Sequence, residues 1–131
     1  MVYKHIVMWK FKEQHNGKSA LENARWMKEQ LEGLVGVVPE LLSAEVGISP
    51  ALEQTAESAA AEAPAPVAAP SNAAAVPAQA ASGEYDACLV STFTSPEALA
   101  AYKVHPKHKA ISAYCKEARL KRLAFDWWSE E

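Results

Sequence analysis

Residues 2–12 alternate between two faces without a break, and this alternation constrains the fold more than any other feature of the sequence. The residues of one face are Tyr3, His5, Val7, Trp9 and Phe11. The other face is mostly apolar as far as Met8 and becomes charged at Lys10 and Lys12. A period of two is that of a β-strand. Because apolar side chains stand on both faces, this strand needs a cover on each side of its sheet.

An amphipathic helix follows a polar loop at residues 14–18. Ser19 and Glu22 fit a reciprocal capping box, in which each side chain accepts a hydrogen bond from the backbone amide of the other residue. Apolar side chains then recur at helical spacing at Leu21, Ala24, Met27, Leu31 and Leu34. Two glycines mark the frayed end of this helix, and Pro39 forbids its continuation.

The rest of the chain contains further strands and helices. Apolar alternation predicts strands over residues 41–49, 86–94 and 120–128. Ser95-Pro96 starts a helix that runs to about Val104. His105-Pro106 interrupts it, because the residue before a proline disfavours helical geometry, and a further helix then runs from Pro106 through Lys116.

The order strand–helix–strand therefore occurs twice, the second time with a pair of helices. This order predicts an α+β, ferredoxin-like fold, a four-stranded antiparallel sheet with helices on one face. The helices cover only that face, so the apolar residues of the other face need a partner subunit. We expect a homodimer that buries more than roughly 1,000 Å² in total.

Residues 51–83 interrupt this plan between the second and third strands. The segment is rich in alanine, and its prolines break any continuous helix. Such a composition buries too little apolar surface to offset the entropy of ordering. We therefore interpret residues 1–131 as a single domain with a low-complexity insertion at 51–83, in preference to a lid or a partner-binding arm. A short Gly/Ser linker should replace the insertion at a cost within about 1 kcal/mol.

The charge balance argues against several classes of partner. The chain has 13 Lys plus Arg against 16 Asp plus Glu, and three of the acids lie in residues 51–83. A neutral domain lacks the basic surface that nucleic acids and anionic membranes attract, so we expect neither as a partner. We see no membrane span and no signal peptide. Cys88 and Cys115 are too few for a disulfide framework, so we expect two buried thiols in a cytoplasmic protein.

Histidines are the main candidates for chemistry. His105 and His108 flank the helix break at Pro106. As metal ligands they are a weak pair, because a third ligand would have to come from His5 or Asp126 through the fold. No metal is therefore predicted.

Acid–base catalysis is a second interpretation of these histidines, because an imidazole titrates near neutral pH and can move a proton. His5 faces inward with Val7 and Trp9, where a polar ring must find a partner. The alternative is that the histidines hold the helix corner together through hydrogen bonds. If they form a site, we expect four polar residues to converge on one cavity between helix and sheet: Tyr102, His105, His108 and His5.

Three stretches of the chain together form a familiar pattern. The first is the opening strand, Lys4 to Lys12, and the second runs from Pro39-Glu40 through Glu45-Val46-Gly47. The third runs from Tyr85 through Tyr102 to the His105-Pro106-Lys107-His108 corner. Together they resemble the stress-responsive dimeric α/β barrel (Dabb) family over residues 2–50 and 84–128. The resemblance implies a ferredoxin-like monomer that pairs sheet to sheet into a homodimeric α/β barrel.

The resemblance implies little about activity, since most members of the family have none established. One branch comprises plant polyketide cyclases, in which a Tyr and a His act on a linear polyketide between sheet and helices. Carried over by motif, Tyr102 and His108 match that pair. The positions that match pocket-lining or supporting residues are His5, His105 and Asp126. Ala87 stands where those cyclases have a further pocket histidine.

The leading hypothesis is a stress-type α/β barrel protein with a pocket for an apolar or aromatic small molecule and no cofactor. The residues expected to bind this ligand are His5, Val7, Trp9, His105 and Asp126. One alternative is a cofactor-free, polyketide-cyclase-like lyase with His108 as base and Tyr102 as orienting donor. Two others are a haem-type monooxygenase of a similarly built barrel and a non-catalytic interaction protein.

Overall fold

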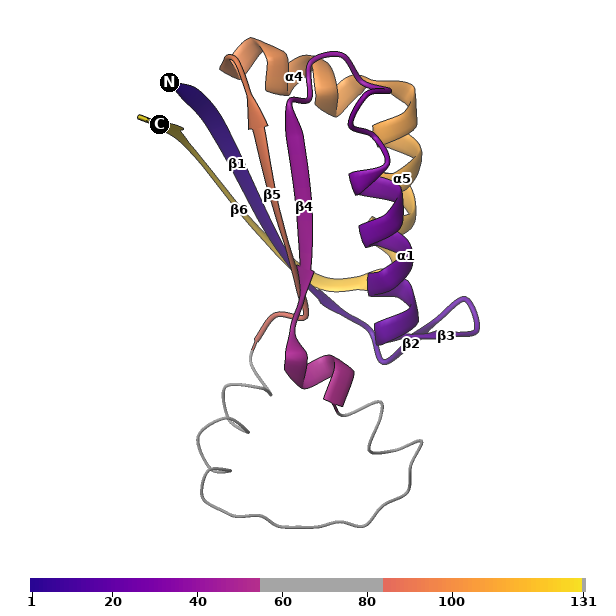
Figure 1. The fold of residues 1–131 in the computed structure, drawn as a ribbon. Coiled ribbons are helices and arrows are strands. Elements are labelled where there is room, and N and C mark those ends of the chain that lie inside the picture. The colour runs from indigo at the N-terminus through magenta and orange to yellow at the C-terminus, as the bar shows by residue number, and fades with distance from the viewer. Residues whose placement is uncertain (55–83, 131) are drawn as a thin grey trace, which may run out of the picture.

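A four-stranded antiparallel sheet with helices on one face forms the centre of the computed structural model, which describes residues 1–54 and 84–130 (Figure 1). The sheet order is β4-β5-β1-β6, with β1 at Val2–Phe11, β4 at Ser43–Ile48, β5 at Ala87–Phe93 and β6 at Arg119–Ser129. The helices are α1 (Ala20–Glu32), α4 (Pro96–Val104) and α5 (Pro106–Ala118). This order confirms the predicted α+β, ferredoxin-like fold. None of the helices in the described ranges is long and apolar enough to cross a membrane.

The loop predicted before α1 is a short hairpin, made of β2 (Gln14–His15) and β3 (Lys18–Ser19). Asn16 and Gly17 form its turn with φ angles of 59° and 75°. Two successive positive φ angles define the tight hairpin turn that an Asn-Gly pair favours. Strands of two residues are too short to show alternation, which is why the sequence pattern indicates only a loop.

The predicted capping box starts α1. Ser19 Oγ accepts a hydrogen bond from the Glu22 amide at 3.1 Å, and Glu22 Oε1 accepts one from the Ser19 amide at 2.9 Å. The buried face of α1 includes Leu21, Ala24, Met27 and Leu31. This face packs against the sheet, mainly over β4.

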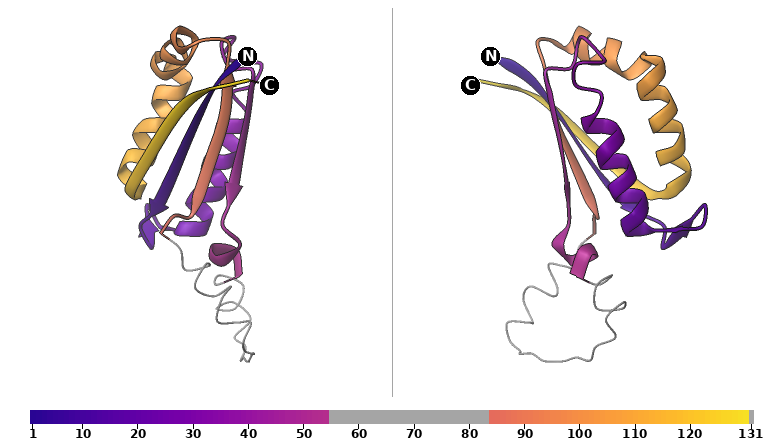
Figure 2. Two further views of the ribbon diagram at one scale, coloured as in Figure 1. Left: turned by 90° about the vertical axis from the view of Figure 1, so that its left-hand side faces the viewer. Right: turned by 45° about the vertical axis from the view of Figure 1, so that its right-hand side comes forward.

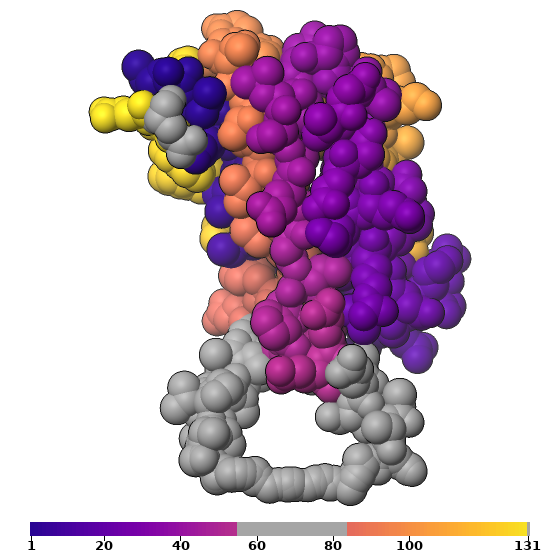
Figure 3. Space-filling view, in the orientation of Figure 1, coloured from indigo at the N-terminus to yellow at the C-terminus, as the bar shows by residue number. Residues whose placement is uncertain are grey.

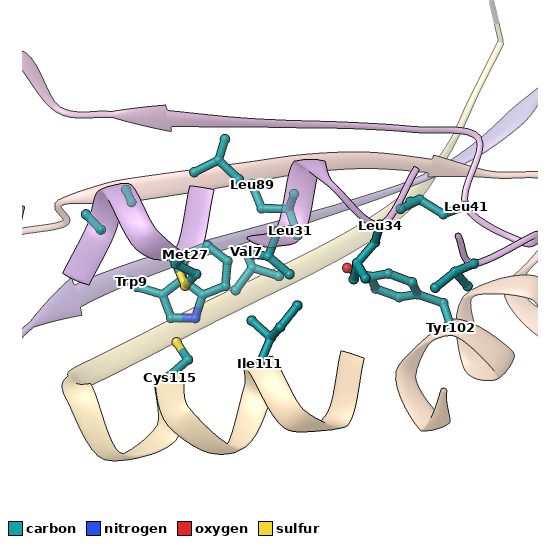
Figure 4. Packing of buried hydrophobic residues seen from close by; sticks show 14 of the residues in the cluster. Val7, Trp9, Met27, Leu31, Leu34, Leu41, Leu89, Tyr102, Ile111 and Cys115 are labelled. Carbon is teal, nitrogen blue, oxygen red and sulfur yellow. The ribbon is translucent and has the colours of Figure 1, made fainter. Parts of the chain in front are cut away.

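The hydrophobic core lies between the sheet and the helices α1 and α5 (Figure 4). Residues that meet there are Val7, Trp9, Leu89, Met27, Leu31, Ile111 and Cys115. Burial raises the pKa of the Cys115 thiol to about 11, so it packs as a small apolar side chain. Cys88 is half-buried on the other side of the sheet, and both cysteines are free.

The opposite face of the sheet, which we call the outer face, has no described helix on it (Figure 2). Its apolar residues are Ile6, Met8, Val90, Leu123, Phe125 and Trp127. Across the strands Ile6 pairs with Phe125. Phe125 is 63% exposed and Leu123 is 51% exposed. Large apolar side chains are therefore gathered on an uncovered surface, as expected for a face that meets a partner.

Residues 51–54, which the sequence assigns to the insertion, belong to the packed structure. Ser49-Pro50 starts a helical turn over residues 50–54, in the same way that Ser95-Pro96 starts α4. The Ser49 carbonyl accepts a hydrogen bond from the Leu52 amide at 3.0 Å. Ala51 is buried and Leu52 packs on the core. The magenta segment that ends at residue 54 lies next to α1 (Figure 3), and Glu53 Oε2 lies 4.0 Å from Arg25 Nη2 of that helix. The rest of the predicted insertion, residues 55–83, lies outside the described ranges.

Two linker replacements test this boundary. A Gly/Ser linker in place of residues 55–83 should change the free energy of unfolding by less than about 1 kcal/mol, since loop closure depends weakly on length. A linker in place of 51–83 should cost about 1–2 kcal/mol more, because the burial of Ala51 and Leu52 is lost. Urea unfolding of both variants measures the difference. Equal stability would contradict the packing of residues 51–54.

Candidate functional site

A cavity of about 270 Å³, here called the histidine cavity, lies between the inner face of the sheet and α5. Its apolar residues are Val7, Trp9, Leu89 and Cys115. Its polar residues are His5, Lys103, His108, Ser112, Arg119 and Arg122. β6 extends away from the helices on this side (Figure 1), and its inner-face residue Ala124 is exposed. The cavity therefore opens to solvent beside β6.

His5 lies in the middle of β1 and is paired across the strands with Asp126 of β6. Its side chain is only 3% exposed, and its Nδ1 lies 2.5 Å from Asp126 Oδ1. A carboxylate only accepts hydrogen bonds, so Nδ1 carries the proton and the lone pair of the neutral ring is on Nε2. Burial lowers the pKa of His5, and the hydrogen bond to Asp126 offsets this only in part.

His108 lies in the first turn of α5, directly after the helix break. Its Nδ1 lies 3.2 Å from the carbonyl oxygen of Lys103 near the end of α4. A carbonyl also only accepts, so Nδ1 donates here too and Nε2 keeps the lone pair. Burial lowers the pKa of His108, the bond to the Lys103 carbonyl opposes this, and the nearby charges of Lys103 and Arg122 lower it further.

The two histidines therefore offer the same chemistry to a ligand in the cavity. Each is held through Nδ1 by a fixed acceptor, and neither Nε2 has a hydrogen-bond partner among the described residues. Their lowered pKa values keep both rings neutral near pH 7. A neutral imidazole with a free Nε2 is a general base.

Tyr102 and His105 do not line the histidine cavity, although the sequence predicts them there. Tyr102 is fully buried and packs against His108 in a tilted arrangement, with ring centroids 4.3 Å apart. Its hydroxyl has no hydrogen-bond partner in the described ranges. His105 caps α5 instead, since its Nδ1 accepts a hydrogen bond from the Lys107 amide at 3.1 Å. His105 has an extended backbone, with ψ at 135°, and serves the helix corner. For His105 the alternative of a structural role therefore fits the geometry.

The structure brings together four of the predicted site residues, His5, Val7, Trp9 and His108, with Asp126 behind His5. The cavity residues that the sequence analysis missed are Lys103, Ser112, Arg119 and Arg122. Strand alternation alone places Arg122 on the same face as Asp126, so this signal was present. No local pattern marks Lys103 or Ser112, because their positions depend on how α4 and α5 pack.

The other clusters of the described residues carry less chemistry. No group of three His, Cys, Asp or Glu side chains within them is arranged to hold a metal ion. A second cavity of about 300 Å³, on the outer side of the sheet, contains Asp86. The Asp86 carboxylate already accepts hydrogen bonds from the Phe11 amide at 2.9 Å and from Lys10 Nζ at 3.2 Å. The histidine cavity is therefore the better candidate.

Several solved structures share this fold. A dimeric protein of unknown function from Bacteroides fragilis NCTC 9343 matches with a TM-score of 0.65 and 20% identity, covering 98% of this chain and 96% of that chain. A dimeric ferredoxin-like protein of unknown function from Jannaschia sp. CCS1 matches with a TM-score of 0.62 and 22% identity, covering 98% and 100%. The hydroxynitrile lyase of Passiflora edulis matches with a TM-score of 0.63 and 16% identity, covering 99% and 95%.

These similarities define the class of the protein, a small ferredoxin-like α+β domain. The family model of Dabb, the stress responsive A/B barrel domain, matches residues 3–61 and 72–129. The chain therefore belongs to the Dabb family, as its sequence motifs predict. No curated protein matches it.

Mild acid should destabilise this protein. The pKa values of folded His5 and His108 lie below the unfolded value of about 6.5, so the unfolded chain binds more protons as the pH falls. Stability is therefore full above about pH 7 and decreases below about pH 6.5. Thermal unfolding across this range measures the effect. A His5→Gln/His108→Gln variant should lose this pH dependence, whereas His15→Gln should keep it. Identical profiles for the double variant and the wild type would contradict the buried neutral state.

Proposed function

We propose that this protein is a cofactor-free enzyme that uses His5 and His108 to move protons on a small molecule bound in the histidine cavity. The observation that carries the proposal is the pair of imidazoles with Nδ1 fixed and Nε2 free. The nearby Lys103 and Arg122 support it, because positive charges stabilise the anion that forms when a substrate loses a proton.

The shape and lining of the cavity limit the substrate. A volume of about 270 Å³ lies just below the usual range for ligand pockets, which favours a small substrate over haem. Val7, Trp9 and Leu89 give an apolar surface that suits an aromatic or aliphatic body. The fold is also that of a hydroxynitrile lyase, which supports lyase-type proton transfer as the reaction class.

Deuterium exchange into a ketone tests the proton transfer. We would use phenylacetone and its acid analogue phenylpyruvate, which both carry an acidic C–H next to a carbonyl. Nε2 takes this proton, the electron pair moves to the carbonyl oxygen as an enolate, and a deuteron from D₂O returns to the carbon. The wild type should exchange at least one ketone faster than buffer does. His5→Gln and His108→Gln should each lower the rate by about 10²–10⁴-fold, followed by NMR.

Two variants serve as controls for this experiment. His15→Gln removes a histidine in the β2–β3 hairpin, away from the cavity, and should exchange at the wild-type rate. Tyr102→Phe should also exchange, because its hydroxyl does not line the cavity; loss of exchange would restore the orienting role expected for Tyr102. Exchange no faster than buffer with either ketone would contradict the enzyme and favour the non-catalytic interaction protein.

We also infer that two copies pair through their outer faces into a homodimeric α/β barrel. The support is the row of apolar side chains on a face with no described helix, where Leu123 and Phe125 are exposed and Ile6 is half-buried. The fold is shared with dimeric proteins from Bacteroides fragilis and Jannaschia. Such an interface should bury more than about 1,000 Å².

A charge placed on the outer face should separate the subunits. Phe125→Glu buries a carboxylate in the proposed interface and should give a monomer, because a buried unpaired charge is strongly unfavourable. Val104→Glu is the matched control, since Val104 is 66% exposed and Phe125 63%, but Val104 lies on α4. Sedimentation velocity at micromolar concentration measures both variants. A wild-type monomer, or a Phe125→Glu dimer, would count against this interface.

The cytoplasm is the compartment we propose for this protein. Cys88 and Cys115 are both free, and burial raises the pKa of each thiol, Cys115 to about 11. Thiols persist in reducing compartments, whereas oxidising ones favour disulfides. Two unpaired cysteines therefore support a reducing location.

A further inference from the structure

The polar side of the histidine cavity is strongly basic. Lys103, Arg119 and Arg122 line it, and no Asp or Glu side chain does. Asp126 lies on the same face of β6 as Arg122, and its carboxylate accepts a hydrogen bond from His5. Within the part of the chain that the structure describes, none of the three cations forms an ion pair with a carboxylate. The three cations therefore outnumber the single negative charge of Asp126 at the cavity.

A β-bulge brings both arginines to this one cavity. Residues three apart on a regular strand face opposite sides, which would put Arg119 and Arg122 on different faces. The register between β1 and β6 shifts after Lys10, so Arg122 lies opposite Trp9 and Arg119 lies opposite Phe11. Both partners belong to the inner face of β1. Bulges beside functional sites re-aim side chains in this way, which favours a binding role over a merely solvated basic strand.

The two arginines suit one kind of ligand group. A guanidinium is planar and offers parallel N–H donors that match the two oxygens of a carboxylate. Arg122 is exposed and Arg119 half-buried, so the charges lie toward the open side of the cavity, beside β6. Trp9 and Leu89 are almost fully buried and give an apolar inner surface. A molecule that matches both parts has a carboxylate at one end and an apolar body at the other.

We propose that the ligand of the histidine cavity is a small carboxylic acid with an apolar or aromatic body, held through its carboxylate by Arg119 and Arg122. Lys103 adds charge on the α4 side of the cavity. The proposal names the substrate class of the enzyme proposed above and rests on that function for its chemistry, but binding is measured independently of turnover. The sequence predicts an apolar or aromatic ligand, and this proposal restricts that ligand to an anion.

Calorimetric titration of phenylpyruvate and phenylacetone tests this proposal, because phenylacetone has a methyl group in place of the carboxylate. The wild type should bind phenylpyruvate at least about tenfold more tightly. Arg119→Gln and Arg122→Gln should each weaken binding of the acid by about tenfold and leave binding of the ketone unchanged. Arg122→Lys should recover part of the loss, since it keeps the charge without the planar pair of donors.

Lys121→Gln is the matched control, because it removes a positive charge from the same strand on the outer face, where Lys121 pairs with Lys10. Equal affinity for the two probes, no saturable binding of phenylpyruvate, or an equal loss in Lys121→Gln would overturn the proposal. Arginine-dependent binding without deuterium exchange would keep the carboxylate site and remove the enzyme. Histidine-dependent exchange with equal binding of both probes would keep the enzyme and remove the carboxylate site.

Discussion

The register between β1 and β6 decides where the side chains of the candidate site lie. It sets His5 against Asp126 on the inner face and Ile6 against Phe125 on the outer face. A slip of one residue would move each of these side chains to the other side of the sheet. His5 would then lose its hydrogen-bond acceptor, and a buried polar group without a partner costs about 1–3 kcal/mol. The same pairing therefore positions the proposed proton-transfer group and the apolar surface proposed to meet a second subunit.

Burial and positive charge act together in the histidine cavity. Both lower the pKa of His108 and so keep its ring unprotonated and available as a base near neutral pH. A lower pKa also makes a weaker base, so the substrate must be made more acidic in turn. Lys103 and Arg122 do this if an anion forms beside them, because they stabilise the product of the proton transfer. The same positive charges thus keep the ring of His108 unprotonated before the reaction and stabilise the anion that would form on the substrate.

Local signals predicted the fold and part of the site. Strand alternation and the capping box depend on neighbouring residues, and both appear in the structure as the sequence indicates. His5 and His108 were found from the face of a strand and from a helix break. The sequence predicts Tyr102 and His105 in the cavity, but neither side chain lines it, because the direction of side chains around the break depends on the ψ angle of His105. Arg119 reaches the cavity only through the bulge, which no local pattern in the sequence reveals.

Different parts of the chain meet at the two ends of the sheet. Val2 pairs with Ser129 at one end, near the two termini (Figure 1), and Ile48 pairs with Ala87 at the opposite end. The hydrogen bond between His5 and Asp126 joins residues 121 positions apart, so it is among the most non-local contacts in the fold. Non-local pairings are slow to form, because the chain entropy is lost before the contact is gained. A chain released before β6 has been made therefore lacks the acceptor for His5 and one wall of the cavity, so the candidate site forms only with this last strand.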